Sequence, residues 1–478
     1  MTSQQIPRLH LSALAVLVTS LTACAIMSGI EPTAVVRNAA SFDLPVATPV
    51  ELASTSWWRE FGDEQLNTLI SQALADNPNL KLVQSRLVRA RAVTEVVDAA
   101  LLPQVNAGLD FTHQRYTSNG AVPAPLAGSE RSSGTLQFSA SWELDFFGKY
   151  RATLDAALGT VKAAQADAQA AQVLLSANVV RSYFTIVRLN EQLVVARRAL
   201  ALREEALNLV RDRVNAGLDT RLELSQSEGS VPEARQHIEA LLEQQALAQN
   251  ALAALIAQPN GHQVPVTVQL LAIKNVANPS TLQADLLGRR ADIVAARWRV
   301  EAARHDIINA KTQFYPNINL NAFAGFSSIG LERLLDPGST QWGVGPALRL
   351  PIFEGGRLRA NLIGKTADYD AAVESYNAAV FDAIHDVADQ LVSVKSIARQ
   401  QVQQQAAQAA AEAAHEIAVQ RFKAGLGNYL NVLASEIPLL AQRNQAVELA
   451  ARALDARVAL IRAVGGGYAS DVVTAAPH

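Results

Sequence analysis

Few side chains in this chain could carry out chemistry, and their spacing supports no familiar reaction. Cys24 is the single cysteine among 478 residues, so no disulfide can form within the chain. The eight histidines are scattered, and none pairs with another at metal-binding spacing on one helix face. The sequence has no glycine-rich phosphate loop and no nucleophile elbow. These patterns predict a protein that is not an enzyme and that needs no metal or other cofactor.

The clearest pattern in the chain is a segment that occurs twice. The stretch from Arg213 to Glu228 returns from Arg421 to Glu436, 208 residues further on and without a gap. Both copies share the opening Arg, an Ala-Gly-Leu, a later Leu and the closing Ser-Glu. Copies so far apart indicate two large structural units rather than a short solenoid repeat. The chain is therefore predicted to be internally duplicated.

A long stretch that favours helix leads into each copy. Residues 151–216 and 358–424 contain no proline and only one glycine each. At about 1.5 Å per residue, each stretch would form a helix about 100 Å long, which suits a coiled coil or a helical tube. Shorter helices are expected before the strands, and returning helices after the repeated segment, over residues 78–101, 292–314, 221–257 and 429–464.

The repeated segment itself predicts a helical hairpin. Gly217 and Gly425 fit the left-handed position that follows a helix C-terminus. Thr220 with Glu223 forms the pattern of a capping box for the next helix. In the second copy Asn428 is the expected cap, and Asn431 replaces the glutamate.

Four short segments alternate between apolar and polar residues, as strands with one apolar face do. They lie at residues 104–112, 136–146, 317–326 and 342–350, and turn-rich loops over 115–133 and 327–340 join them in pairs. About nine to eleven alternating residues is the length of a tilted transmembrane strand. Four strands cannot close a barrel, and an open sheet edge is not tolerated in lipid. The chain must therefore oligomerise, in a number of copies that these physical arguments leave open.

The start of the chain predicts export and a lipid anchor. One positive charge, Arg8, precedes an apolar run from Leu11 to Leu21 that is too short to span a bilayer. The run ends in Leu21-Thr-Ala-Cys24, which resembles the lipobox of bacterial lipoproteins, so Cys24 is the expected lipidation site. Ala25, rather than Asp, favours sorting to the outer membrane by the same resemblance. No later stretch reads as a transmembrane helix, and the net charge of −3 argues against a nucleic-acid partner.

Together these features resemble the TolC-like outer-membrane efflux proteins, and within them the lipoprotein (NodT-like) branch that serves resistance-nodulation-division (RND) pumps. Two further motifs carry the resemblance: Trp57-Trp58-x-x-Phe61-x-Asp63-x-x-Leu66, and Arg289-Arg290-Ala291-Asp292-Ile293, in which the family usually has Pro where Ala291 stands. The resemblance implies a mixed α and β-barrel fold. Three copies would form a 12-stranded outer-membrane β-barrel that continues into a long periplasmic α-helical barrel of coiled-coil character.

The resemblance also implies a function. The chain would be the passive exit duct of a tripartite efflux pump, conducting drugs or other toxic small molecules and so contributing to antibiotic resistance. Its partners would be a periplasmic adaptor protein, an RND transporter and outer-membrane lipid. An alternative with the same fold is a channel for type I protein secretion with an ABC transporter. A third possibility, a periplasmic coiled coil without a pore, is disfavoured by the four amphipathic strands.

The pattern and the resemblance predict a division of the chain. Residues 1–23 would be the signal peptide and 24–60 a lipid-anchored linker. The first efflux repeat would cover 61–262, with its hairpin at 103–146 and tunnel helices at 151–258. A linker at 263–281 would lead to the second repeat at 282–467, with its hairpin at 316–351 and tunnel helices at 358–464, and 468–478 would be a tail.

The family resemblance assigns roles to residues at the two helical hairpins. Asp219, Arg221, Glu223 and Asn431 are candidates for a periplasmic gate, and Asp219 and Arg221 could pair across subunits. For Glu223 the capping box is a sufficient alternative explanation. Residues at the tips would receive the adaptor, namely Gly217, Leu218, Gly425 and Leu426.

Overall fold

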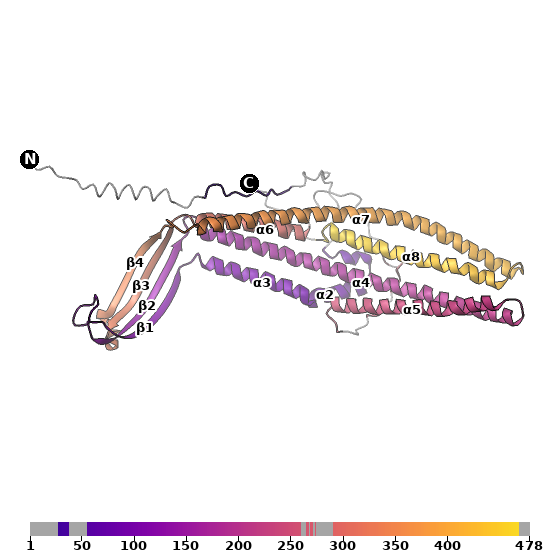
Figure 1. The fold of residues 1–478 in the computed structure, drawn as a ribbon, viewed down its shortest axis with the longest axis horizontal. Coiled ribbons are helices and arrows are strands. Elements are labelled where there is room, and N and C mark those ends of the chain that lie inside the picture. Colours follow the sequence, from indigo (N-terminus) through magenta and orange to yellow (C-terminus); the bar gives the residue numbers. More distant parts are fainter. Residues whose placement is uncertain are drawn as a thin grey trace, which may run out of the picture. The chain divides into compact units, whose positions relative to one another are not determined.

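The structure is a computed structural model that describes residues 27–37, 55–259, 264–266, 268–270, 273 and 290–467. The signal peptide, Cys24, Arg289, most of the 263–281 linker and the 468–478 tail lie outside these residues. A 3₁₀ helix, Trp57–Phe61, is followed by α2 (Glu64–Asp76) and α3 (Pro78–Ala99). The first strand pair leads into α4 (Lys149–Asn215) and α5 (Arg221–Leu255). The second half has α6 (Ala291–Thr312), the second strand pair, α7 (Arg357–Lys423) and α8 (Tyr429–Ala463), as Figure 1 shows.

The four strands form one antiparallel sheet in the order β1-β2-β3-β4. Their bounds are Gln104–Arg115, Glu130–Leu144, Asn317–Ile329 and Thr340–Arg349. All four expected strands are present, but β2 begins six residues earlier than the alternation predicted and ends at Leu144 rather than at Phe146. The two hairpins join through the pairing of β2 with β3, so the sheet unites both halves of the sequence.

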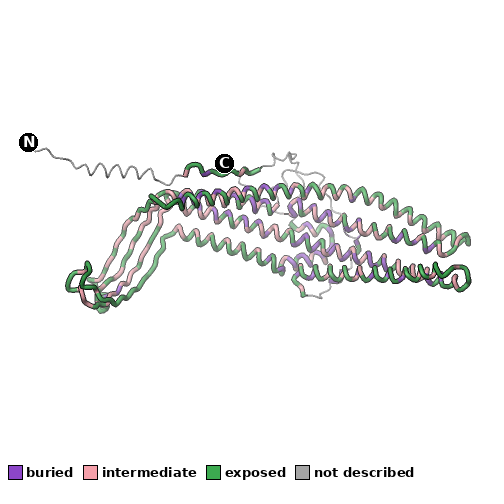
Figure 2. Tube along the Cα trace, in the orientation of Figure 1, coloured by how far each residue is buried: buried purple, intermediate pink, exposed green. Residues whose placement is uncertain are grey.

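The strand register keeps the apolar side chains on one face of the sheet. Leu109 lies opposite Leu136, which in turn lies opposite Phe326. In the same way Ala324 lies opposite Trp342, and Ala322 opposite Val344. A shift of one residue would turn every side chain of a strand to the other face, so this register matches the alternation of all four strands at once. The apolar face is exposed in the single chain, with almost no buried position along the strands in Figure 2.

Glycines explain the weaker alternation of the last two strands. A Cβ at Gly343 would lie 2.6 Å from the ring of Phe323, a large apolar residue on the polar face. A Cβ at Gly325 would lie 2.1 Å from the backbone oxygen of Leu136. Gly325 therefore requires glycine, because backbone occupies the place of a side chain, whereas a side chain at position 343 would displace the Phe323 ring.

The helices agree with their predicted bounds to within about two residues. Each of the two long helices, α4 and α7, has 67 residues. The returning helices have 35 residues each and continue through Pro232 and Pro438, which do not end them. Sequence patterns did not reveal α2, which Asp63 caps through its carboxylate and the N–H groups of Gln65 and Leu66.

The described residues divide into two compact units. Unit 1 draws on Met1–Val36, Leu87–Ala164 and Ala296–Tyr376 and contains the sheet; unit 2 comprises the remaining segments, Arg37–Arg86, Gln165–Ala295 and Asn377–His478. Each unit thus takes segments from both halves of the sequence, and α4 and α7 contribute residues to both units.

Unit 2 has the largest core, and the Trp57 motif lies in it. Trp57 and Phe61 are each 1% exposed, and the Phe61 ring meets Phe184 edge-on at 5.1 Å. The buried Tyr183 hydroxyl donates to Asp63 over 2.6 Å. Burial, and then this hydrogen bond, raises the pKa of Tyr183. Trp57 and Trp58, near the end of the predicted 24–60 linker, therefore pack in a folded core.

One helix is more apolar than the sequence patterns suggested. Among the described helices, α4 contains an 18-residue window with a mean hydropathy of 1.2, which is long and apolar enough to cross a membrane. Half of that window is buried inside the protein. Because Leu175, Val179 and Val180 of α4 belong to the core of unit 2, core packing accounts for the apolar composition.

Candidate functional site

The first helical hairpin has the geometry that its sequence predicts. Gly217 follows α4 with φ +70°, and Leu218 N–H donates to the carbonyl of Arg213 over 2.8 Å. Thr220 then caps α5: its hydroxyl accepts from Leu222 N–H, while Glu223 Oε2 accepts from Thr220 N–H over 3.0 Å. The predicted C-terminal glycine and capping box are both present.

The second hairpin repeats this geometry. Gly425 follows α7 with φ +75°, and Leu426 N–H donates to the carbonyl of Arg421 over 2.9 Å. Asn428 caps α8 by accepting from Asn431 N–H over 3.0 Å, in place of the reciprocal capping box of the first hairpin. The two tips are therefore structural copies, as the repeated sequence predicts.

Both tips present an apolar side chain to solvent. Leu218 is 67% exposed and Leu426 is 70% exposed. A Cβ at Gly217 or Gly425 would meet no atom within 4 Å, so the backbone beside each leucine is open. Each tip therefore carries one exposed leucine beside an open backbone.

The gate candidates lie close together at the first hairpin, except for Asn431, which belongs to the second. Asp219 accepts two hydrogen bonds from Arg213 of its own chain, at 2.7 and 2.8 Å. This contact with Arg213 lowers the pKa of Asp219. Arg221 is exposed at the first position of α5. Pairing of Asp219 with Arg221 across subunits stays a prediction, and it would compete with the contact to Arg213.

Glu223 is engaged as a helix cap. Its carboxylate accepts from both the backbone N–H and the hydroxyl of Thr220. The Thr220 hydroxyl, followed by the backbone donors, lowers the pKa of Glu223. The carboxylate therefore carries a negative charge near neutral pH, at a place where it also stabilises the start of α5.

Sequence reasoning missed the contacts between α4 and α8. Arg181 pairs with Asp455, Arg188 with Glu448 at 3.1 Å and Arg198 with Glu436 at 2.7 Å. The positions on α4 rise as those on α8 fall, which is the pattern of two antiparallel helices packed along one seam. The matching spacing of arginines and acidic residues was the available signal, but it has meaning only once the helices are known to be neighbours.

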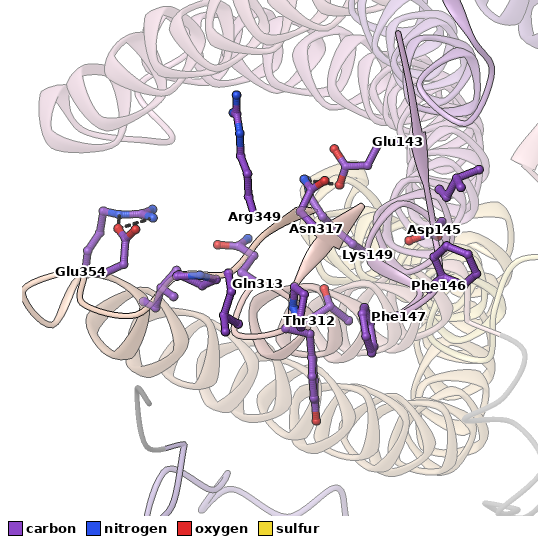
Figure 3. Close-up of a pocket in the computed structure, with 17 residues that line it drawn as sticks. Glu143, Asp145, Phe146, Phe147, Lys149, Thr312, Gln313, Asn317, Arg349 and Glu354 are labelled. Atoms are coloured by element: carbon purple, nitrogen blue, oxygen red, sulfur yellow. Dashed lines mark hydrogen bonds and ion pairs between the residues drawn. The ribbon is translucent and has the colours of Figure 1, made fainter. Parts of the chain in front are cut away.

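A cavity of about 360 Å³ lies in unit 1 where strands meet helices, and Figure 3 shows its lining. Glu143 at the end of β2 accepts from Lys149 at 2.9 Å and from the Tyr150 hydroxyl at 2.8 Å. Burial, and then the contact with Glu143, raises the pKa of Tyr150 to about 12. The Phe147 and Tyr315 rings stack at 5.0 Å. Lys149 and Tyr150 together hold Glu143 at the turn from β2 into α4.

A metal ion would need a set of ligating side chains gathered among the described residues. No group of three or more His, Cys, Asp or Glu side chains among them could hold a metal ion. Three carboxylates of α8, on Asp455, Glu448 and Glu436, pair with arginines of α4. The features that distinguish the molecule are therefore its sheet and its two helical tips.

Comparison with known proteins places these features in a family. The sequence model described as "Outer membrane efflux protein" matches residues 69–258 and 282–466, one match in each half of the duplication. The chain is 32% identical to the multidrug resistance outer membrane protein MdtQ of Escherichia coli O157:H7, over 89% of this chain and 90% of that protein. It is 37% identical to the fusaric acid resistance protein FusA of Burkholderia cepacia, over 73% of this chain and 68% of that protein.

Solved structures agree with the sequence comparison. The crystal structure of the outer membrane protein VceC of Vibrio cholerae is 33% identical and superposes with a TM-score of 0.79. The alignment covers 87% of this chain and all of that one. The expected TolC-like fold and the outer-membrane location are confirmed, and the efflux relatives support that function over protein secretion. The chain belongs to the outer membrane efflux protein family and is an outer-membrane efflux channel.

Proposed function

We propose that this chain forms, as a homotrimer, the exit duct of a tripartite efflux pump for drugs or other toxic small molecules. The observation that carries the proposal is the four-stranded sheet with one apolar face and two outer edges, β1 and β4, which pair with no further strand among the described residues. Lipid does not tolerate such edges, so each must pair with another copy. Three copies supply twelve strands, within the range of bacterial outer-membrane barrels.

The duct conducts passively and catalyses no reaction. Its partners are a periplasmic adaptor at the tips, through Leu218 and Leu426, and an RND transporter that supplies the energy. The names of two relatives, MdtQ for multidrug resistance and FusA for fusaric acid resistance, support small toxic molecules as cargo. Asp219, Arg221, Glu223 and Asn431 line the gate in this proposal.

The proposal also divides the chain. Residues 1–23 are the signal peptide, and Cys24 carries the lipid. The efflux repeats cover residues 61–262 and 282–467, joined by the 263–281 linker and followed by the 468–478 tail. The two family matches, which begin at residue 69 and at residue 282, support the division into repeats.

Two measurements test the duct. Purified protein in detergent should have the mass of three chains, and it should give discrete ion-conducting steps in a planar bilayer. Leu109→Lys combined with Val344→Lys, on the apolar strand face, should abolish insertion because a lysine at the bilayer midplane costs about 2–4 kcal/mol. A monomeric protein, or conductance that survives both substitutions, would contradict the proposal.

Lipidation is tested separately. Radiolabelled palmitate should enter the wild-type protein and not Cys24→Ser, because the thiol is the attachment point. Equal labelling of the two proteins would exclude Cys24 as the anchor while leaving the duct unaffected.

A further inference from the structure

The segment that follows Cys24 is docked on unit 1 rather than loose. Residues 27–36, here called the strap, lie against α6 and α7 without regular secondary structure. Ile30 is 7% exposed and packs with Ile307 and Leu362. An apolar side chain buried in this way fixes the middle of the strap to the helices.

One carboxylate fastens the far end of the strap. Asp370 of α7 accepts from Thr33 N–H at 3.1 Å, from the Thr33 hydroxyl at 2.8 Å and from Ala34 N–H at 3.1 Å. The three hydrogen bonds are charge-assisted because their acceptor is an ionised carboxylate, and such bonds are stronger than those between neutral groups. Asp370 therefore holds two consecutive backbone N–H groups of the strap.

The strap runs parallel to α7. Ser28 accepts from Arg359 at 3.3 Å near the start of α7, and Thr33 binds Asp370 eleven residues later. Thr33 lies five residues after Ser28, and Asp370 lies about 16 Å of helix after Arg359, so the strap and α7 run in the same direction. The N-terminal end of the strap thus lies at the start of α7, next to the connection from β4.

Because the strap starts beside the beginning of α7, a lipid attached just before it is restricted to that end of unit 1. Cys24 precedes Met27 by three residues, which span at most about 11 Å. A free linker from residue 24 to the core at Trp57 would instead have an end-to-end distance of about 30 Å. A shorter tether raises the effective concentration of the attached group at its site.

We infer that the strap is a short tether clamped by Asp370, which keeps a lipid on Cys24 beside the strand ends of unit 1 and so holds the sheet at the membrane surface before the barrel closes. The inference rests on the proposed lipidation of Cys24. Asp370 acts as a positioning residue. It holds the strap, and through the strap it keeps the lipid on Cys24 close to the bilayer.

The clamp is tested by amide hydrogen exchange in the purified protein. Exchange at Thr33 and Ala34 should be protected in the wild type and about tenfold faster in Asp370→Ala, because the acceptor of both amides is gone. Asp368→Asn is the matched control: Asp368 is on the same helix and pairs with Lys365, so exchange at the strap should not change. Unchanged exchange in Asp370→Ala would overturn the clamp.

The tether is tested by its length. A Gly-Ser insertion of about twelve residues after Ala25 should slow formation of the heat-resistant oligomer in cells about twofold or more, and Asp370→Ala should do the same. A protein that carries both the insertion and Asp370→Ala should form the oligomer no more slowly than a protein with either change alone. The same insertion after Ala40, beyond the clamp, should have no effect.

The possible outcomes separate the two proposals. An insertion after Ala25 that changes nothing, while Asp370→Ala slows assembly, would show that the clamp does not act through the tether. Equal slowing by both insertions would also overturn the inference. If the wild-type protein takes up no palmitate, the lipidation proposal fails together with the tether, whereas the exchange of Thr33 and Ala34 still decides the clamp.

Discussion

Arg198 of α4 binds Glu436 of α8 through two hydrogen bonds, from Nε to Oε1 at 2.7 Å and from Nη2 to Oε2 at 3.1 Å. The Glu436 side chain is 10% exposed, whereas that of Arg198 is 55% exposed. The hydrogen bond to Glu436 raises the pKa of Arg198. The pair joins the second tip hairpin to a helix of the first half of the chain.

Removing the arginine alone should destabilise the protein. Arg198→Ala leaves the buried Glu436 carboxylate without its partner, at a cost of about 1–3 kcal/mol, reduced by the exposure of the arginine. Arg198→Met combined with Glu436→Leu removes both charges and should recover most of this loss. Thermal unfolding of both variants measures the difference. A double variant less stable than Arg198→Ala would contradict this explanation.

The start of α5 should loosen in acid. The Thr220 hydroxyl lowers the folded-state pKa of Glu223, so the stabilisation is present above the unfolded pKa near 4 and is lost as the pH falls through the lower folded value. The hydrogen bond from Arg213 likewise lowers the folded-state pKa of Asp219, so its stabilisation is also lost in acid. Hydrogen exchange at Leu222 and Glu223, corrected for intrinsic rates, should rise below about pH 4. In Glu223→Ala this pH dependence should be much weaker.

Glu223→Gln separates a gate from a cap. Glutamine at the third helical position preserves the reciprocal capping contact but removes the charge. If the carboxylate helps to close the duct, Glu223→Gln should give a leakier pore in a planar bilayer with nearly unchanged thermal stability. If its conductance equals that of the wild type while Glu223→Ala only lowers stability, Glu223 serves as a cap alone.

The two exposed leucines should be needed for docking but not for folding. Leu218→Glu with Leu426→Glu places a charge where an apolar helix contact is expected, and an unpaired charge buried there costs several kcal/mol. The double variant should form a normal heat-resistant oligomer at normal abundance, with no efflux and no cross-link to the adaptor. Leu222→Glu, also exposed but on α5 beyond the tip, is the control that should retain the cross-link. Efflux and cross-linking that persist in the double variant would exclude the tips as the docking site.

The strand loops should face the cell exterior. Cysteines at Ala121 and Gly338, introduced into Cys24→Ser, suit labelling because Ala121 is exposed and a Cβ at Gly338 meets no atom within 4 Å. An impermeant thiol reagent applied to intact cells should modify both cysteines but not one at Asn215, at the end of α4. Modification of Asn215→Cys alone would reverse the topology.

The sequence alone predicted the structural features that depend on residues close together in the chain. Strand alternation and helix caps depend on neighbours within a few residues, so the β1 alternation and the Thr220 cap could be read directly. The pairing of β2 with β3 and the contact of Arg198 with Glu436 join residues from different halves, and no local pattern encodes them. The strap was missed for a similar reason: Asp370 is an ordinary acidic helix residue in the sequence, and its contact with Thr33 appears only in the folded structure.

The composition of the units has a consequence for how the chain can fold. The core of unit 2 contains Trp57 from the beginning of the chain and Val458 from near its end. The sheet of unit 1 likewise needs β1 and β4, from different halves. When only the first half of the chain has been exported, neither the core of unit 2 nor the sheet of unit 1 can be completed. Contacts between residues so far apart in the sequence also form slowly. The duplicated halves are not separate folding domains, so an exported chain must be kept from aggregating until nearly all of it has crossed the inner membrane.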